Sequence, residues 1–289
     1  MSIQRREFLK TAGLLSSGLM LTGLGSSLAG CSSAKGGNAS AIKESFGLQL
    51  YTLRDVLPKD VKGVLKQVAD FGYKEIEGYE GSMGLFWGMK NTEFKKYLDD
   101  LGMKMVSSHC GWKENFEQKA AQAAEIGMSY LFCPYLGPNK QLDFYKKAAE
   151  DFNKNGEIAK KAGIRFGYHN HDYSFKPVEG QLPQDVMMQG TSADTVDYEM
   201  DIYWVVAAGQ DPVAWFKKYP NRFRLAHVKD RKGDESVVAG TGTIDFPTIL
   251  KEGQNYGLKH FIVEQEAYTG TTPINAVRDN ALYMKNIKV

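Results

Sequence analysis

Histidine and acidic residues recur at one kind of place in this chain, directly after short apolar runs. His109, His169 and His227 each stand at or near the end of such a run. Asp201 closes another run, and Glu264 follows a further one. If these runs are parallel strands of one barrel, their carboxyl ends share one mouth, and we expect the side chains to converge there.

Imidazoles and carboxylates on separate, adjacent strands suit a divalent ion of intermediate softness. We predict that one ion is held by His169, Asp201, His227 and Glu264. Glu266 would share a face with Glu264 but lie nearer the loop, because Glu264 directly follows the apolar run. The residues leave the identity of the ion open among Mn²⁺, Co²⁺, Zn²⁺ and Mg²⁺.

The same mouth would carry candidates for proton transfer. Glu264 or Glu266 could act as the base. Lys229, two residues past His227, could donate a proton or hold an oxyanion, although a solvated loop lysine is the alternative. His171 is a further candidate for the acid.

Residues after other strand ends could contact a sugar. The rings of Tyr51 and Trp204 suit the C–H faces of a sugar, with packing at the barrel mouth as the alternative interpretation. His109 could hydrogen-bond to sugar hydroxyls. Arg54 could meet an anionic substrate, but no glycine-rich phosphate loop accompanies it.

Short apolar runs alternate with longer stretches of helical spacing from Phe46 onward. Several helical stretches end in glycine just before the next run, as Gly163 does, and glycine commonly closes helices. Eight such units predict a single (β/α)₈ TIM barrel, and no dinucleotide fingerprint supports an open sheet. The predicted strands are Gly47–Tyr51, Tyr73–Gly78, Lys104–Ser108, Tyr130–Pro134, Ile164–His169, Val196–Asp201, Phe223–Val228 and Phe261–Glu264.

The composition excludes several classes of protein. The 289 residues are 43% hydrophobic and carry 36 Lys+Arg against 34 Asp+Glu, which is ordinary for a globular chain and not for collagen or a disordered protein. Three cysteines cannot build a disulfide framework. The net charge of +2 resides in residues 1–30, so the remaining body is neutral and we expect no nucleic acid as partner.

We interpret the first residues as a targeting segment and not as part of the fold. Arg5-Arg6-Glu-Phe-Leu-Lys10 resembles a twin-arginine export signal, and Leu28-Ala-Gly-Cys31 resembles a lipoprotein cleavage box. We therefore predict a signal at 1–30, lipidation of Cys31, a flexible tether at 31–45 and the barrel at 46–289. The chain would be exported and held at the periplasmic face of a membrane by its lipid. A plain amphipathic start that stays in the cytoplasm is the alternative.

Seven segments of the body, which follow one another in the same order as in that family, resemble the xylose isomerase-like TIM barrel superfamily, in its sugar phosphate isomerase/epimerase branch. That resemblance implies a divalent metal bound by Glu, Asp, His and Glu at the ends of strands five to eight. Asp201, His227 and Glu264 match, whereas His169 stands where the epimerases have glutamate. The segments are Gly47–Arg54, Gly167–Asp172, Asp201–Trp204, Ala208–Pro212, His227–Asp230, Gly240–Asp245 and Val263–Glu266.

The resemblance implies an isomerase or epimerase that acts on a keto-sugar through a metal-stabilised enediolate. Since His169 replaces one of two opposed glutamates, an inosose-type dehydratase or a lyase of 3-keto-glycosides is the alternative, because elimination needs one base and one acid. A non-catalytic sugar-binding lipoprotein belongs to another class, and it would be expected to lose metal ligands. Related repair endonucleases need a positive groove, which a neutral body does not supply. The oligomeric state is left open.

Overall fold

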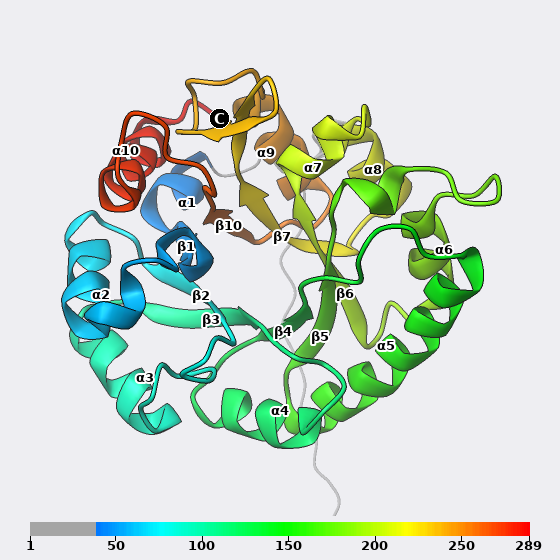
Figure 1. Cartoon of the computed structure of the whole chain (residues 1–289), viewed down its shortest axis with the longest axis horizontal. Coiled ribbons are helices and arrows are strands. Elements are labelled where there is room, and N and C mark those ends of the chain that lie inside the picture. Colours follow the sequence, from blue (N-terminus) through cyan, green and yellow to red (C-terminus); the bar gives the residue numbers. More distant parts are fainter. Residues whose placement is uncertain (1–38) are drawn as a thin grey trace, which may run out of the picture. The chain divides into compact units, whose positions relative to one another are not determined.

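Eight parallel strands close a barrel in which neighbours along the sequence are neighbours in space (Figure 1). The computed structural model describes residues 39–289, so the expected signal, Cys31 and most of the expected tether lie outside the described residues. The fold is the predicted single TIM barrel. Its strands are β1 (Gly47–Gln49), β2 (Glu75–Tyr79), β3 (Lys104–His109), β4 (Tyr130–Cys133), β5 (Arg165–His169), β6 (Val196–Asp201), β7 (Phe223–Val228) and β10 (His260–Val263).

Helices surround the barrel and connect its strands. The side chains of Asp60, Asp211, Asp245 and Thr272 each accept a backbone N–H in the first turn of a helix, which satisfies a group that helix geometry leaves unpaired. The helices are α1 (Ala39–Glu44), α2 (Val61–Asp70), α3 (Asn91–Asp100), α4 (Phe116–Glu125), α5 (Leu142–Ala162), α6 (Pro183–Gly190), α7 (Ile202–Ala207), α8 (Pro212–Lys218), α9 (Phe246–Asn255) and α10 (Pro273–Asn286), with 3₁₀ turns η1 (Leu50–Leu53), η2 (Leu57–Lys59) and η3 (Asp172–Phe175).

Most predicted strands differ from those of the structure by one or two residues at one or both ends, and three departures stand out. Strand β1 stops at Gln49 and not at Tyr51, because the Gln49 side chain accepts the backbone N–H of Tyr51 and starts η1. The end of the expected tether forms α1, in which Ile42 is fully buried and which packs against α10. A hairpin of β8 (Asp230–Lys232) and β9 (Glu235–Val237) follows β7, where no strands are predicted.

Strand register brings the candidate site together. Asp201 on β6 is the direct partner of His227 on β7, and His227 is in turn the partner of Ile262 on β10. On β5, Gly167 allows the ring of Phe132 to fill the barrel beneath the site, since a Cβ there would lie 2.3 Å from that ring. The mouth is therefore supported from below by packed side chains.

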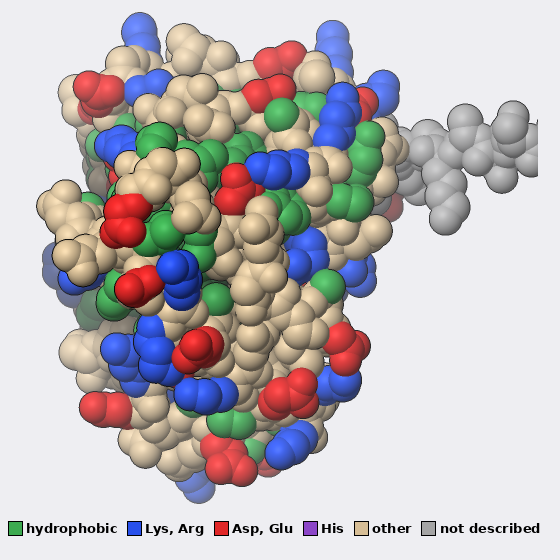
Figure 2. All heavy atoms as spheres, turned by 90° about the vertical axis from the view of Figure 1, so that its right-hand side faces the viewer, with side chains coloured by type: hydrophobic (Ala, Val, Ile, Leu, Met, Phe, Trp, Pro, Cys, Tyr) green, Lys and Arg blue, Asp and Glu red, His purple; other side chains and the backbone are tan. Residues whose placement is uncertain are grey.

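The outer surface carries both signs of charge. On the face seen in Figure 2, lysine and arginine side chains are interspersed with aspartate and glutamate. Opposite charges pair, for example, between Lys147 and Asp151 within α5 and between Lys218 of α8 and Asp185 of α6. Within residues 39–289, no helix combines the length and the apolar character needed to span a bilayer.

Candidate active site

The four predicted ligands meet at the carboxyl-terminal mouth of the barrel. Asp201 Oδ2 lies 3.5 Å from His169 Nε2 and 3.6 Å from His227 Nδ1. Glu264 Oε2 lies 3.1 Å from His227 Nδ1. Donor atoms of a tetrahedral ion with bonds of about 2.1 Å are separated by about 3.4 Å, so these spacings fit one small divalent cation.

Both imidazoles in this set direct a nitrogen at the site. His169 Nε2 is buried and has no hydrogen-bond partner, while its Nδ1 lies 3.3 Å from the carbonyl oxygen of Pro134. On His227, Nε2 is held 2.7 Å from Glu77 Oε1, which leaves Nδ1 facing Asp201 and Glu264. Metal-binding histidines are commonly oriented by such a contact through the second nitrogen. The donor set therefore fits the implied metal.

Sequence reasoning missed two buried carboxylates beneath these ligands, Glu77 on β2 and Glu199 on β6. Glu77 accepts hydrogen bonds from Gln49 Nε2 at 2.7 Å and from Ser107 Oγ at 2.6 Å. Glu199 Oε2 lies 2.7 Å from His109 Nε2. Their signal in the sequence is weak: each glutamate stands two residues from another acid, Glu75 or Asp201, within a predicted strand.

A second cluster of possible ligands lies deeper, formed by His109, His169, Glu199 and His227. It shares two imidazoles with the outer set, and His109 is already hydrogen-bonded to Glu199. The outer set also has two carboxylates where the inner set has one. The geometry therefore favours a single ion, bound by the outer set.

Ionised carboxylates outnumber the positively charged groups in the site. Burial opposes ionisation of Asp201, Glu199 and Glu264, yet nearby Lys229 or His227 hold the pKa of each below its usual value. Burial also opposes a charge on His227, but Glu199 and Glu264 outweigh it and raise its pKa. Buried charges must be paired. A divalent cation would balance the carboxylates that Lys229 and the imidazoles only partly offset.

Lys229 is part of the site and not a solvated loop residue. Its side chain is 1% exposed, and Nζ lies 3.4 Å from Asp201, 3.3 Å from Glu264 and 3.0 Å from Glu266. The ring of Trp204 lies 4.9 Å from the same ammonium. Burial alone would lower the pKa of Lys229, but the adjacent carboxylates Asp201, Glu264 and Glu266 raise it, so the lysine carries its proton at neutral pH.

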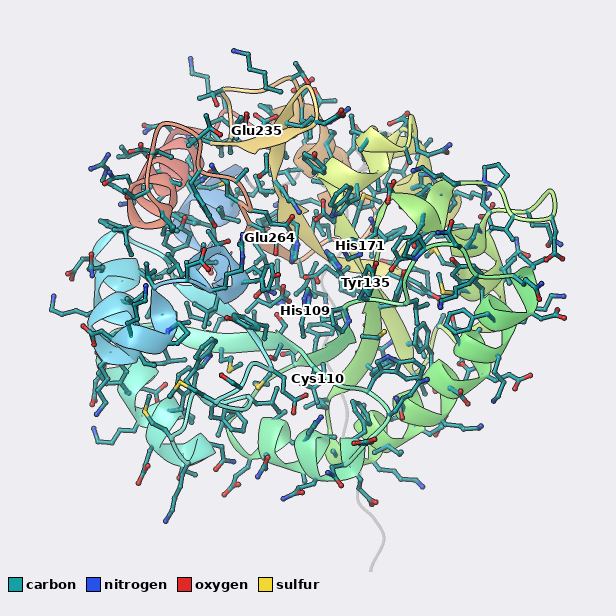
Figure 3. The ribbon with its side chains drawn as sticks, viewed as in Figure 1. His109, Cys110, Tyr135, His171, Glu235 and Glu264 are labelled. Carbon is teal, nitrogen blue, oxygen red and sulfur yellow. The ribbon has the colours of Figure 1, made fainter. Side chains whose placement is uncertain are left out.

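A cavity of about 550 Å³ opens above the ligands. Figure 3 shows His109, Tyr135, His171 and Glu264 around it near the barrel axis, while Glu235 lies out on the β8–β9 hairpin. The expected contacts Tyr51, His109, His171 and Glu266 do line it, whereas Tyr135 was missed by sequence reasoning. The full lining is Tyr51, Tyr79, Glu80, His109, Cys110, Gly111, Trp112, Pro134, Tyr135, His169, His171, Glu264 and Glu266.

Two residues expected to contact substrate do not line the cavity. They contact and hold other residues of the mouth instead. Arg54 Nη2 donates to the carbonyl oxygen of Glu266 at 2.9 Å, and its guanidinium lies 4.7 Å from the ring of Tyr51. It ties η1 to the loop after β10, so an anionic substrate has no free arginine there. Trp204 packs between His171, whose ring lies 5.5 Å away, and Lys229.

His171 and Glu266 line the cavity with shifted acidities. Burial and the neighbouring His169 lower the pKa of His171 to about 2, which favours the neutral imidazole. Burial and the charge of Glu264 raise the pKa of Glu266 above its usual value. With a third of its side chain exposed, Glu266 remains accessible from the cavity.

Comparisons with known proteins show the family to which the chain belongs. A model of the family described as xylose isomerase-like TIM barrel matches residues 65–287. An inosose dehydratase from Clostridium beijerinckii is 27% identical over 157 residues, which are 48% of this chain and 49% of the relative. The chain thus spans about half the length of the inosose dehydratases from Clostridium that it matches.

Solved structures extend the likeness to the whole barrel. A sugar phosphate isomerase/epimerase from Parabacteroides distasonis has 32% identity and a TM-score of 0.75, over 85% of this chain and 96% of its own. The IOLI protein with a bound zinc atom has a TM-score of 0.67 over 83% of this chain and 98% of its own, but at 14% identity it shows a shared fold alone. By the match over most of its barrel, this chain belongs to the xylose isomerase-like TIM barrel family, whose members here include sugar isomerase/epimerase and inosose dehydratase relatives.

Proposed function

We propose that this protein is a divalent-metal-dependent enzyme that removes the proton next to the carbonyl of a keto-sugar or cyclic keto-polyol. The ion would be held by His169, Asp201, His227 and Glu264, whose donor spacing fits it. When bound, a divalent cation supplies a Lewis acid that makes the neighbouring C–H more acidic. Glu264 serves the ion, which leaves Glu266 as the carboxylate free to take the proton.

One observation favours elimination over epimerisation: apart from the metal ligand Glu264, the cavity offers a carboxylate for proton transfer on one side only. Glu264 and Glu266 both follow β10. The third acid, Glu80, is held by the ammonium of Lys119 and by the backbone N–H of Gly111, each at 2.7 Å. An epimerase needs a second group on the opposite face of the substrate to return the proton, and no free carboxylate of this lining offers it.

The elimination balances with the groups in place. Glu266 takes the proton next to the carbonyl, a carbon–carbon double bond forms, and the bond from the next carbon to an oxygen breaks. That oxygen leaves as water from an inosose or as an alcohol from a 3-keto-glycoside, and it takes its proton from the ammonium of Lys229. Lys229, 3.0 Å from Glu266, then recovers a proton from the protonated carboxyl of Glu266, so both groups return to their starting state.

Isomerisation or epimerisation of a keto-sugar is the second candidate. The Parabacteroides relative, which bears that name, favours it through its 32% identity across the barrel. The inosose dehydratase relatives favour elimination. A sugar-binding lipoprotein without activity would not need the buried Lys229 set among three carboxylates.

The test is to follow the metal-loaded full chain by NMR in D₂O with an inosose, a 3-keto-glucoside and a free ketose. We expect loss of the proton next to the carbonyl together with release of water or alcohol. Epimerised ketose with solvent deuterium at one carbon and no eliminated product would overturn the preference for elimination. The absence of any exchange would overturn the enzyme proposal itself.

A further inference from the structure

The cavity has more room than the metal site requires. At about 550 Å³ it lies in the range of sites that bury drug-sized ligands, which are larger than one monosaccharide. Its polar floor consists of the metal ligands His169 and Glu264 with Glu266 beside them. A single keto-sugar ring seated on that floor would leave the outer part of the cavity to be filled by something else.

The outer part is walled by aromatic rings, two of which are exposed. The exposed fraction is 53% for Tyr135 and 40% for Tyr51. In the described part of the chain, only Met83 and Leu282 among the large hydrophobic residues are similarly exposed. Both exposed aromatic rings of residues 39–289 therefore belong to one cavity, where exposed apolar surface commonly marks a binding site.

These exposed rings are held in fixed orientations from behind. Tyr135 packs edge-on against Tyr173 and His171, with ring centroids 5.5 and 5.0 Å away. Tyr51 packs edge-on against Tyr79 at 5.2 Å. Rigid aromatic faces bind another ring with little loss of side-chain freedom.

Tyr135 is also close to the reacting end of the cavity. The ring of His171 lies 5.0 Å from Tyr135 on one side and 5.0 Å from the predicted ligand His169 on the other. The ring of His171 would thus be the one ring between Tyr135, with a group stacked on it, and the predicted metal ligand His169. The leaving group of a glycoside whose sugar ring lay on the floor would extend from the ion toward the outer part of the cavity, where Tyr135 stands.

We propose that Tyr135 forms a leaving-group subsite that takes a second ring, either a pyranose or an aryl group. The inference rests on the proposed function, because it assigns the leaving group of that same reaction. It makes the substrate a glycoside with a ring-shaped aglycone, and not a free monosaccharide. The shared chemistry of both ring types is a flat C–H or π face that stacks on tyrosine.

The test uses inert ligands, so that it does not depend on turnover. Binding of methyl, phenyl and glucosyl β-glucosides, none of them oxidised, is measured by calorimetry on the metal-loaded full chain. Wild type should bind a ring-bearing glucoside about 10-fold more tightly than the methyl glucoside. Tyr135→Ala should remove that advantage, Tyr135→Phe should keep it, and Leu282→Ala, which removes a similarly exposed side chain on α10, should behave as wild type.

The outcomes separate this inference from the proposed reaction. An advantage for the phenyl compound, the glucosyl compound or both supports the subsite and identifies its ring. Equal affinity for all three in wild type, no detectable binding of the ring-bearing compounds, or a full advantage in Tyr135→Ala overturns it. If the advantage depends on Tyr135 but no keto-glycoside is eliminated, the subsite stands and the proposed reaction is wrong.

Discussion

At the scale of single residues, Glu264 and Glu266 are two positions apart but serve different purposes. Glu264 lies 3.1 Å from His227 within the ligand set, whereas Glu266 contacts Lys229 and is a third exposed to the cavity. We expect Glu266→Gln to retain the ion and lower kcat by about 10²–10⁴-fold, since it removes only the base. Glu264→Gln should lose the ion and the activity together. Metal content and kcat of both variants check this, and equal metal loss in the two would contradict it.

Lys229 is a second residue whose replacement should affect metal binding and turnover differently. Lys229→Met removes a positive charge 3.3–3.4 Å from two ligand oxygens, so the cation should bind at least as tightly as before. Turnover should fall by about 10²–10⁴-fold if the lysine supplies the proton to the leaving group. The loss should be smallest for an aglycone that departs without a proton. A loss of equal size for good and poor leaving groups would exclude this role.

The sequence indicates the four candidate ligands because they end strands, where an apolar run gives way to a polar side chain. Glu77 and Glu199 escaped notice because they lie inside strands, where a charged residue looks like an exposed one. Only the closed barrel shows that they face its interior and hold His227 and His109. The role of Arg54 depends on a contact with Glu266 across 212 positions of sequence, which no local pattern reveals.

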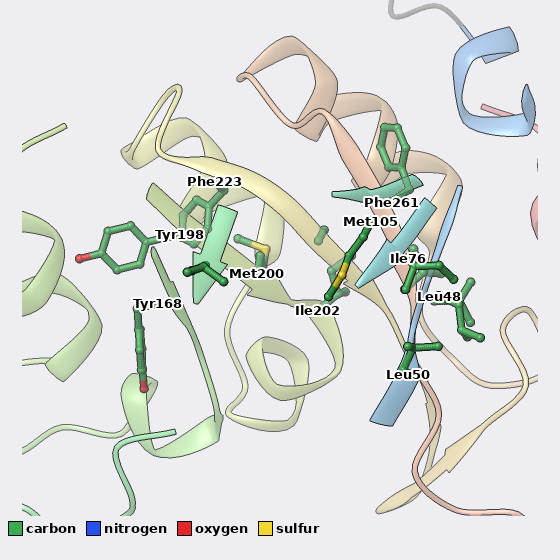
Figure 4. Packing of buried hydrophobic residues seen from close by; sticks show 14 of the residues in the cluster. Leu48, Leu50, Ile76, Met105, Tyr168, Tyr198, Met200, Ile202, Phe223 and Phe261 are labelled. Atoms are coloured by element: carbon green, nitrogen blue, oxygen red, sulfur yellow. The ribbon is translucent and has the colours of Figure 1, made fainter. Parts of the chain in front are cut away.

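At the scale of elements, the barrel closes across its shortest strand. Leu48 and Ile76 pack together outside β1 and β2 near Leu50, as Figure 4 shows. At the amino-terminal end, Glu75 of β2 reaches past β1 to His260 of β10, with Nδ1 and Oε2 2.8 Å apart. This hydrogen-bonded contact lies at the end of the barrel opposite the candidate metal site.

The Glu75 pair predicts a pH-dependent stability. Burial would raise the pKa of Glu75, but the hydrogen bond and charge of His260, with Lys104, hold it below its ordinary value of 4.5. A lowered pKa stabilises the fold above about pH 4.5 and loses that effect as the pH falls through the folded value. Glu75→Gln should therefore cost about 1–3 kcal/mol at pH 7 and less at lower pH. Urea unfolding of metal-free wild type and variant tests this, and a difference that does not change with pH would contradict it.

Elements were predictable where hydrophobic spacing was strong. Strands β6 and β7 match their predicted bounds, because apolar residues alternate with acidic ones along β6 and predominate in β7. The β8–β9 hairpin lacks that signal, since Asp230–Lys232 and Glu235–Val237 are short and mostly polar. Its place is fixed by Asp230, whose buried carboxylate accepts the backbone N–H groups of Gly240 and Gly242.

At the scale of the whole molecule, we propose that the barrel is exported and anchored by a lipid on Cys31. The support is the order of the basic pair, the apolar run and the Leu-Ala-Gly-Cys box, which lie outside the described residues. Cys31→Ser should move the protein from the membrane fraction to the soluble fraction without changing kcat, because the site is built within 39–289. Cys110→Ser is the matched control, and unchanged fractionation of Cys31→Ser would exclude the anchor.

The central claim is that one divalent cation sits on His169, Asp201, His227 and Glu264, and metal analysis of purified variants tests it most directly. Asp201 and Asp211 both cap helices, accepting the backbone N–H of Trp204 and Val213 respectively, so Asp→Asn at either position preserves the cap. Only Asp201 also faces the ion. The account predicts one ion per chain in wild type and Asp211→Asn, and less than about a tenth of that in Asp201→Asn, since removing a charged ligand weakens binding strongly. A wild-type chain that turns over its substrate after complete removal of metal, or an Asp201→Asn chain that retains a full ion, would contradict it.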